Sequence, residues 1–186
     1  MEIDSLYFVT SNVHKFMEVK EIMSKYNLKV KHIRESYPEV QADSIEDVMK
    51  YAAKWLAERY KLRPLVAEDA GLFIRALKGF PGVYSAFVYR TIGIEGILHL
   101  MSKVEDRYAL FKSVAALIVD SEVKLFVGKT EGYITRRPKG VGWGFDPIFS
   151  PRDWPSHTYA SLGRLKNTLS HRYKSFKDLA EYIIGR

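Results

Sequence analysis

The chain has 186 residues, no cysteine and a formal net charge of +7, with 47% apolar and 13% aromatic residues. This composition excludes a disordered chain, as well as disulfides and thiolate metal sites, and the absence of cysteine fits a reducing cytoplasm. The length predicts a single domain over residues 1–186, and the acidic N-terminus and short apolar runs predict neither a signal peptide nor a membrane span. The positive charge favours an anionic partner such as a nucleotide or nucleic acid, with no specific partner as the alternative.

Leu6–Val9 is predicted to be a short buried strand, followed at once by small polar residues. Thr10, Ser11 and Asn12 can each cap a helix or turn the chain, and an amphipathic helix with Lys15 near its start is predicted next. The free N–H groups and the dipole of a helix N-terminus favour phosphate, and Lys15 adds a positive charge. The glycines of a P-loop are missing, so an ordinary capped helix with a surface lysine is an equal alternative.

Residues 28–33 are predicted to form a second strand, and a capping box at Ser44 is predicted to open a helix. The apolar stripe of this helix is more typical of a core than of a site, and its members are Ile45, Val48, Met49, Ala52, Ala53 and Leu56. Glu39, Glu46 and Lys50 are polar residues near its start that are usually solvated when taken alone.

Leu65, Val66 and Ala67 are predicted to be a short buried strand that ends at the adjacent carboxylates Glu68 and Asp69. Gly71 is expected to let the backbone turn sharply there. Ligands gather at the carboxyl ends of strands in open α/β sheets, and carboxylates there can hold a divalent cation. The alternative is a solvated acidic turn.

Residues 108–119 and 123–134 are predicted to be two long strands of an antiparallel hairpin, joined by a compact turn at residues 120–122. Gly128 and Gly132 in the second strand indicate bulges or close packing. A glycine-rich loop over residues 140–147 then carries Trp143 and Phe145. These rings either form a stacking surface for a nucleobase or cover the core.

The last predicted helix carries an apolar stripe, with Ser175 and Asp178 at capping spacing near its start. Before it, Ser170, His171 and Arg172 are consecutive hydrogen-bond donors that are suited to reading base oxygens. A His-Arg pair is otherwise usually a surface feature.

The ordered set of motifs resembles, essentially end to end, the inosine triphosphate pyrophosphatase family. No single motif is decisive, but their occurrence together in this order is specific. The motifs are Thr10-Ser11-Asn12 with Lys15, Glu39-Val40-Gln41, Glu68-Asp69-Ala70-Gly71-Leu72, Phe80-Pro81-Gly82, Trp143-Gly144-Phe145-Asp146-Pro147, and Lys166-Asn167 with Ser170-His171-Arg172.

The resemblance implies a mixed α/β fold, with a long curved central sheet flanked by helices and a cleft between two lobes. It also implies a cytoplasmic homodimer without nucleic-acid or membrane partners. The implied reaction is Mg²⁺-dependent hydrolysis of ITP, dITP and XTP between the α- and β-phosphates, which yields the monophosphate and pyrophosphate.

The resemblance further implies roles for single residues. Asp69 is implied as metal ligand and general base, with Lys15 as the second catalytic residue. Glu39 and Glu68 are further candidate Mg²⁺ ligands, and Glu46 competes with Glu39 for that role. The implied substrate-binding residues are Thr10, Ser11, Asn12, Val13, His14, Lys15, Ala70, Trp143, Gly144, Phe145, Asp146, Lys166, His171 and Arg172, with Lys50 as a weaker candidate.

Selectivity for deaminated purines has a physical explanation. Donors such as His171 or Arg172 favour the 6-oxo group of hypoxanthine and xanthine over the 6-amino group of adenine, but no residue is assigned to the rejection of GTP. The chain departs from the family pattern at Ala70, where many members have Ser or Thr, and at Leu165, where many have Glu. Both departures affect fine affinity and not the class of reaction.

Two alternatives remain from the sequence. One is a pyrophosphatase for modified pyrimidine nucleotides, similar to the Maf group. The other is a basic nucleic-acid-binding protein, whose binding would weaken with salt and need no Mg²⁺. Glu68 and Asp69 argue against the second, because without a metal they would repel a phosphate backbone.

Overall fold

The computed structural model describes residues 4–119 and 122–185. It shows a mixed α/β fold whose seven-stranded sheet has the order β2-β1-β3-β5-β6-β7, with β4 paired to β3. Strand β1 is parallel to β2 and β3, whereas the β3–β4 and β6–β7 pairs are antiparallel. The predicted fold class is confirmed.

The bounds of the elements are as follows. The strands are β1 (Ser5–Val9), β2 (Lys29–Ile33), β3 (Leu65–Ile74), β4 (Pro81–Gly82), β5 (Tyr108–Val119), β6 (Glu122–Ile134) and β7 (Phe149–Pro151). The α-helices are α1 (Val13–Ser24), α2 (Ile45–Arg59), α3 (Ser85–Thr91), α4 (Gly93–Leu100), α5 (Tyr159–Leu162) and α6 (His171–Ile184). Short 3-10 segments are η1 (Arg75–Leu77), η2 (Asp146–Ile148) and η3 (Gly163–Thr168).

The chain divides into two compact units. Unit 1 consists of Met1–Asp69, Ser113–Gly128 and His171–Arg186, and unit 2 of Ala70–Lys112 and Lys129–Ser170. Strands β3, β5 and β6 each contribute residues to both units. The chain therefore enters each unit more than once.

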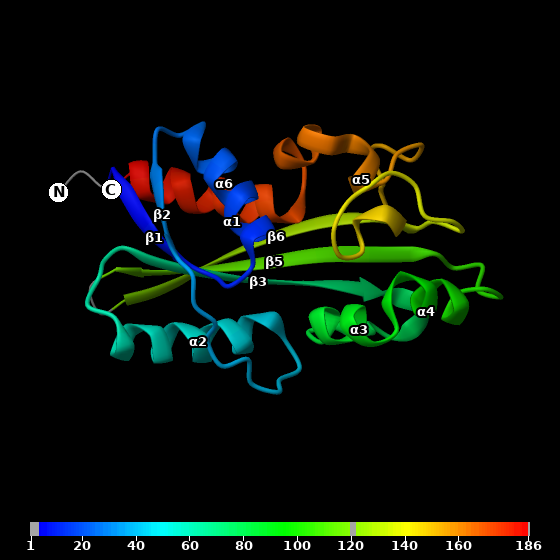
Figure 1. The fold of residues 1–186 in the computed structure, drawn as a ribbon, viewed down its shortest axis with the longest axis horizontal. Coiled ribbons are helices and arrows are strands. Elements are labelled where there is room, and N and C mark those ends of the chain that lie inside the picture. Colours follow the sequence, from blue (N-terminus) through cyan, green and yellow to red (C-terminus); the bar gives the residue numbers. More distant parts are fainter. Residues whose placement is uncertain (1–3, 120–121, 186) are drawn as a thin grey trace. The chain divides into compact units, whose positions relative to one another are not determined.

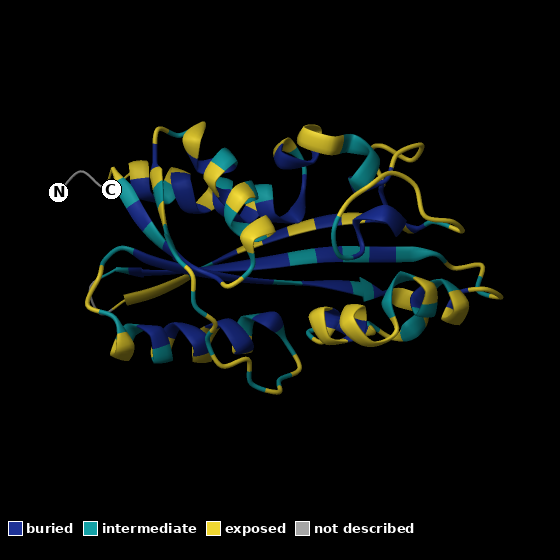
Figure 2. Ribbon diagram, viewed as in Figure 1, coloured by how far each residue is buried: buried dark blue, intermediate teal, exposed yellow. Residues whose placement is uncertain are grey.

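In unit 1, α1 and α6 cover one face of the strands and α2 covers the other (Figure 1). The helix sides that face the strands are buried and the opposite sides exposed (Figure 2). Phe8 of β1 meets Phe176 of α6 edge to face, with ring centroids 5.6 Å apart. The parallel register places Val9 opposite Ala67, so the chain leaves β1 at Thr10 beside the acidic pair on β3.

Unit 2 has its own core. Helices α3 and α4 lie on one face of its strands and α5 on the other (Figure 1). Phe149 of β7 packs between Phe111 and Tyr159, with a centroid distance of 4.8 Å to each ring. Phe145 belongs to the same cluster. Among the described residues of the chain, no helix is long and apolar enough to cross a membrane.

Two predicted boundaries are wrong. Strand β3 does not end at Ala67 but continues to Ile74, so Glu68, Asp69 and Gly71 lie inside a strand and not in a turn. Helix α6 begins at His171 and not near Ser175. The predicted turn at residues 120–122 includes residues 120 and 121, which lie outside the described residues.

Candidate active site

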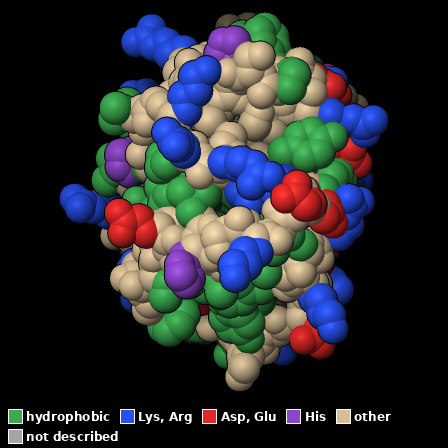
Figure 3. Space-filling view, turned by 90° about the vertical axis from the view of Figure 1, so that its right-hand side faces the viewer, with side chains coloured by type: hydrophobic (Ala, Val, Ile, Leu, Met, Phe, Trp, Pro, Cys, Tyr) green, Lys and Arg blue, Asp and Glu red, His purple; other side chains and the backbone are tan. Residues whose placement is uncertain are grey.

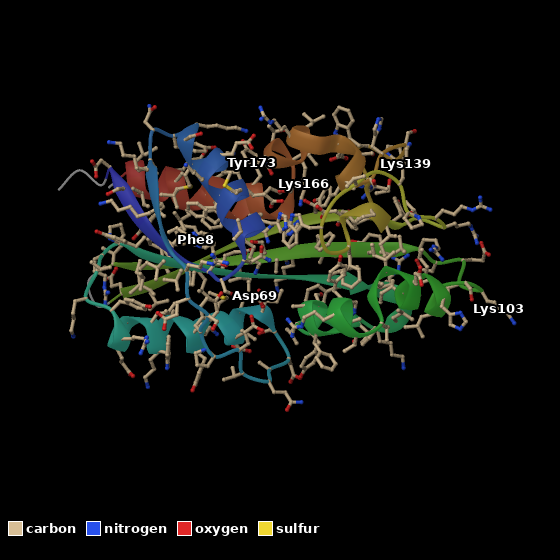
Figure 4. The ribbon with its side chains drawn as sticks, viewed as in Figure 1. Phe8, Asp69, Lys103, Lys139, Lys166 and Tyr173 are labelled. Atoms are coloured by element: carbon tan, nitrogen blue, oxygen red, sulfur yellow. The ribbon has the colours of Figure 1, made fainter. Side chains whose placement is uncertain are left out.

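The acidic pair lies in the middle of the sheet, because β3 is hydrogen-bonded between β1 and β5. Glu68 is 0% exposed and Asp69 is 9% exposed, and Asp69 is labelled in Figure 4. The alternative of a solvated acidic turn is therefore wrong. A buried carboxylate needs hydrogen bonds or ion pairs to remain charged, and both residues have them.

Lys15 reaches the acidic pair from the first turn of α1. The Asn12 side chain caps this helix by accepting hydrogen bonds from the N–H groups of His14 (2.9 Å) and Lys15 (3.2 Å). The Lys15 ammonium lies 3.2 Å from Glu68 Oε2 and 3.3 Å from Asp69 Oδ1. It also donates to the Glu68 carbonyl oxygen at 3.1 Å, so the alternative of a surface lysine is wrong.

Five charges of alternating sign form what we call the ion-pair chain: Glu18, Arg172, Glu68, Lys15 and Asp69. Arg172 of α6 lies 2.6 Å from a Glu18 carboxylate oxygen and 3.1 Å from Glu68 Oε1, and its side chain is 1% exposed. Arg172 is predicted to contact a base, and in the structure its guanidinium pairs with two carboxylates. Its contact with a base stays a prediction.

The ion-pair chain keeps its buried members charged. Burial raises the pKa of Glu68, but the charges of Arg172 and Lys15 and a hydrogen bond from Ser113 outweigh burial, so this pKa is lowered. Burial lowers the pKa of Lys15, but the charges of Glu68 and Asp69 outweigh it, so this pKa is raised. Glu68 is therefore an anion and Lys15 a cation throughout the neutral pH range.

Two buried hydroxyl groups complete the surroundings of Glu68, and the sequence analysis missed both. Ser113 Oγ donates to Glu68 Oε1 at 2.7 Å and lies 2.9 Å from Ser175 Oγ. Both serines are 0% exposed. Their signal in the sequence is a polar residue at an apolar position: Ser113 interrupts the apolar run of β5, and Ser175 lies on the apolar stripe of α6.

Tyr37 connects the loop that carries Glu39 to β3, and it too was missed. Its hydroxyl donates to the Glu68 carbonyl oxygen at 2.9 Å. Burial raises the pKa of Tyr37 well above its ordinary value, and the charges of Asp69, Glu68 and Glu39 raise it further. Glu39 therefore lies near enough to Tyr37 for its charge to raise the pKa of the phenol, as the charge of Asp69 also does. A loop tyrosine carries no pattern that distinguishes it in the sequence.

The carboxylates fit Mg²⁺ only in part. Both oxygens of Glu68 are engaged by Ser113, Arg172 and Lys15, which argues against Glu68 as a ligand. Among residues 4–119 and 122–185, no group of three or more His, Asp or Glu side chains is arranged to hold a metal. Mg²⁺, however, usually keeps several waters and binds one or two carboxylates together with substrate phosphates. Asp69 and the exposed Glu39 stay predicted as two such ligands.

The other acidic and basic candidates near α2 have separate surroundings. Ser44 caps α2 by accepting a hydrogen bond from the N–H group of Asp47 at 3.2 Å. Lys50 pairs with Asp47 at 3.0 Å, and both side chains are exposed. Glu46 lies in the first turn of α2 and is half-buried. The choice between Glu39 and Glu46 as metal ligand stays a prediction. The charge of Glu39 is one of those that raise the pKa of Tyr37.

Unit 2 brings Trp143, Asp146 and Lys166 together. The Lys166 ammonium lies 2.6 Å from Asp146 Oδ2, and both side chains are buried. It also lies 5.1 Å from the centroid of the Trp143 ring, as a cation–π contact; Figure 4 labels Lys166. Phe145 is 3% exposed and meets Tyr89 edge to face. Phe145 is thus a core residue, whereas Trp143 is half-buried.

The remaining predicted residues differ in exposure. Ser11, Val13 and His14 are exposed at the N-terminus of α1, while Thr10 is buried. Ala70 is half-buried on β3, Gly144 has a φ of +60°, and His171 is buried at the start of α6. Unit 1 therefore presents an exposed helix N-terminus next to Lys15, which is the arrangement that favours phosphate.

Comparisons with known proteins find similar sequences and similar folds. A model of the Ham1 family matches residues 6–182. A dITP/XTP pyrophosphatase from Ignicoccus hospitalis is 46% identical over 183 residues, which cover 97% of each chain, and one from Pyrococcus horikoshii is 43% identical over 96% of each chain. The structure of a HAM1 protein from Coxiella burnetii has a TM-score of 0.82 at 28% identity and covers 98% of this chain and 99% of its own.

Proposed function

Since the chain belongs to the Ham1 family, we propose that it is a Mg²⁺-dependent enzyme that hydrolyses dITP, ITP and XTP to the monophosphate and pyrophosphate. Action on non-standard purine nucleoside triphosphates follows from near full-length relatives with 43–46% identity that carry this activity in their names. The observation that supports the residue assignment is the contact between the Asp69 carboxylate, which is 9% exposed, and the Lys15 ammonium of the ion-pair chain.

In unit 1 we assign the chemistry to Asp69, Lys15 and the N-terminus of α1. Mg²⁺, when bound by Asp69 with Glu39 or Glu46, would neutralise phosphate charge and lower the pKa of a bound water. Asp69 is the general base that takes a proton from the attacking water. The N–H groups at the start of α1 and the Lys15 ammonium bind phosphate oxygens. Pyrophosphate leaves as the bond between the α- and β-phosphates breaks.

We assign base recognition to unit 2, as the resemblance implies. Trp143 is the aromatic ring that retains exposed surface for stacking, since Phe145 is committed to the core. The buried Lys166–Asp146 pair fixes that ring from one side through the cation–π contact. Replacing Trp143 by Ala is expected to raise KM for ITP more than it lowers kcat.

The nucleic-acid-binding alternative has less support. On the face drawn in Figure 3, Lys and Arg side chains are interspersed with acidic and hydrophobic ones and do not form one continuous basic stripe. Proteins that bind nucleic acid usually cluster their basic residues. The modified-pyrimidine alternative has no counterpart in the names of the relatives described above.

A pyrophosphate-release assay tests the proposal. ITP, dITP, XTP, GTP and ATP are supplied with and without Mg²⁺ to the wild type, to Asp69→Asn, and to Asp153→Asn as a matched change at an exposed aspartate. We expect Mg²⁺-dependent release from ITP, dITP and XTP by the wild type and Asp153→Asn, with Asp69→Asn slowed at least about 100-fold. Release of inorganic phosphate instead of pyrophosphate would contradict the proposal.

We also propose a homodimer located in the cytoplasm, where nucleoside triphosphates are made and used. The dimer is supported by apolar side chains that unit 2 leaves exposed on and beside α3: Phe87 (59%), Ile92 (45%) and Tyr84 (43%). Light scattering after size-exclusion chromatography gives the mass, and Phe87→Asp is expected to shift it to that of a monomer. A wild type with the mass of a monomer would contradict the proposed dimer. A Phe87→Asp variant that keeps the mass of a dimer would contradict the proposed surface.

A further inference from the structure

The Lys15 ammonium has acceptors for all of its hydrogen-bond donors. An ammonium carries three N–H groups, and three oxygens lie around this one: the Glu68 carbonyl oxygen at 3.1 Å, Glu68 Oε2 at 3.2 Å and Asp69 Oδ1 at 3.3 Å. The side chain is only 16% exposed. Lys15 thus holds one oxygen of the carboxylate that the proposed metal requires.

From these contacts we propose that Lys15 and the divalent cation compete for Asp69, and that substrate phosphate relieves the competition by drawing the ammonium away. This inference rests on the proposed function, because it needs a metal that binds Asp69. A cation near Asp69 and the Lys15 ammonium would repel each other by Coulomb's law.

Glu68 makes such an exchange feasible. When Lys15 moves, Glu68 keeps Arg172 at 3.1 Å and Ser113 at 2.7 Å, so no buried carboxylate is left unpaired. Asp69 then has the cation in place of Lys15. Loss of Lys15 from a lone buried carboxylate would instead leave an uncompensated charge.

Competition of this kind couples the binding of the metal to the binding of the substrate. A triphosphate that binds the Lys15 ammonium frees Asp69 and so strengthens metal binding, and by reciprocity the metal strengthens triphosphate binding. The coupling requires the positive charge on Lys15. A neutral side chain at position 15 should bind metal more tightly without nucleotide while binding the triphosphate more weakly.

The experiment is a Mn²⁺ titration followed by electron paramagnetic resonance, at pH 7.5 and without nucleotide. Mn²⁺ is the probe, and the proteins are the wild type, Lys15→Met, and Lys20→Met as a matched control at an exposed lysine of the same helix. Lys15→Met preserves the length of the side chain and removes its charge. We expect its Kd for Mn²⁺ to be about tenfold lower than that of the wild type, with Lys20→Met unchanged within about twofold.

Each outcome decides the inference. Equal or weaker Mn²⁺ binding by Lys15→Met overturns the competition and leaves the proposed metal site intact. No Mn²⁺ binding by any of the three proteins overturns the competition, and the Mg²⁺ dependence of the proposed function is then decided by the pyrophosphate-release assay. Pyrophosphate release from ITP is a separate measurement, so failure of the proposed activity would be seen there and not in the titration.

If Lys15→Met does not fold, a second measurement on the wild type tests the inference. The ammonium groups of lysines are observed by ¹H–¹⁵N correlation spectroscopy, and the Lys15 signal is assigned by its loss in Lys15→Arg, which keeps the positive charge. We expect Mg²⁺ to shift the Lys15 signal progressively as the site fills. A Lys15 signal that does not move at saturating Mg²⁺ overturns the inference.

Discussion

Glu68 shows how a full charge is kept on a side chain with no exposed surface. Two cations and a hydroxyl group contact its two oxygens, and its backbone carbonyl accepts from Tyr37 and Lys15. Removing one partner from such a buried arrangement is costly, because the remaining groups cannot recover water. The neighbours of Glu68 are therefore as sensitive to substitution as Glu68 itself.

Ser113→Ala is the smallest change that tests this view. It removes the hydroxyl that donates to Glu68 Oε1 and leaves that oxygen with Arg172 alone, so we expect a loss of about 1–3 kcal/mol in the free energy of unfolding. Urea denaturation measures it, with Ser102→Ala at an exposed position as control. A loss no larger than that of the control would show that the hydrogen bond contributes little.

Tyr37→Phe tests whether the hydrogen bond between Tyr37 and β3 holds the position of the loop that carries Glu39. The aromatic ring remains, and the hydroxyl is lost together with its hydrogen bond to the Glu68 carbonyl and its longer contact with the Met49 sulfur. We expect the Mg²⁺ concentration for half-maximal pyrophosphate release to rise about three- to tenfold, because Glu39 is held less firmly near Asp69. At saturating Mg²⁺ kcat should stay within about twofold of the wild type.

The control is Tyr51→Phe, which removes a hydroxyl from an exposed tyrosine on α2. An equal Mg²⁺ requirement in Tyr37→Phe, Tyr51→Phe and the wild type would contradict the positioning role. A general loss of stability would lower activity at every Mg²⁺ concentration, and the shape of the Mg²⁺ curve distinguishes the two.

At the scale of elements, the contact between β6 and α6 places Arg172. Gly128 of β6 lies so close to the start of α6 that a Cβ atom added there would lie 1.9 Å from the His171 carbonyl oxygen and 2.5 Å from the Ser175 nitrogen. Both are backbone atoms that cannot rotate away. The missing side chain at residue 128 therefore sets how closely α6, with Arg172, approaches the sheet.

Gly128→Ala is expected to force these elements apart. We predict a loss of about 1–3 kcal/mol in the free energy of unfolding, as for other overpacked cores, measured by thermal or urea denaturation. Val127→Ala, at the exposed neighbouring position of the same strand, reports the ordinary cost of a substitution there. Equal stability of the two variants would mean that α6 tolerates the displacement.

Elements with a regular apolar pattern could be predicted from the sequence, and those interrupted by charge could not. All six predicted apolar residues of α2 are buried, because a helical stripe needs only a period of 3.6. The prediction ends strand β3 at Ala67, because two adjacent carboxylates are typical of the end of a strand, whereas the strand continues to Ile74. Their partners, Lys15 and Arg172, are far away in the sequence, so no local pattern shows that charge is tolerated inside this strand.

In the candidate site, too, some residues could be predicted from the sequence and others could not. The residues found by motif, such as Lys15, Asp69 and Lys166, carry charges that stand out in a sequence. Those that support them do so through single hydroxyl groups or the lack of a side chain, as in Tyr37, Ser113 and Gly128. Such residues become visible only when the fold brings them to their partners.

For the molecule as a whole, the ion-pair chain makes the free energy of unfolding depend on pH. The lowered pKa of Glu68 means that the unfolded chain takes up a proton more readily than the folded one. This contribution is fully present above the ordinary glutamate pKa of about 4.3 and is lost as the pH falls through the lower pKa of the folded state.

We therefore expect urea midpoints of the wild type to be level near neutrality and to fall below about pH 4 to 5. In Ser113→Ala the pKa of Glu68 loses one lowering cause and lies closer to its unfolded value, so the fall should be smaller and should end at a higher pH. Other carboxylates titrate equally in both proteins, and the difference between the two curves isolates Glu68. Superimposable curves would contradict the coupling of Ser113 to Glu68.

The division of unit 1 into three chain segments has a consequence for biosynthesis. Glu68 leaves the ribosome early, with the first segment, whereas Arg172 belongs to the last, which begins at His171. Until α6 has emerged, the nascent chain cannot give Glu68 its arginine or bury the strands beneath that helix. Completion of this unit therefore waits until α6 has been translated. A message truncated before codon 172 yields a product in which Glu68 lacks its arginine and the strand surface beneath α6 stays exposed, and both features favour degradation.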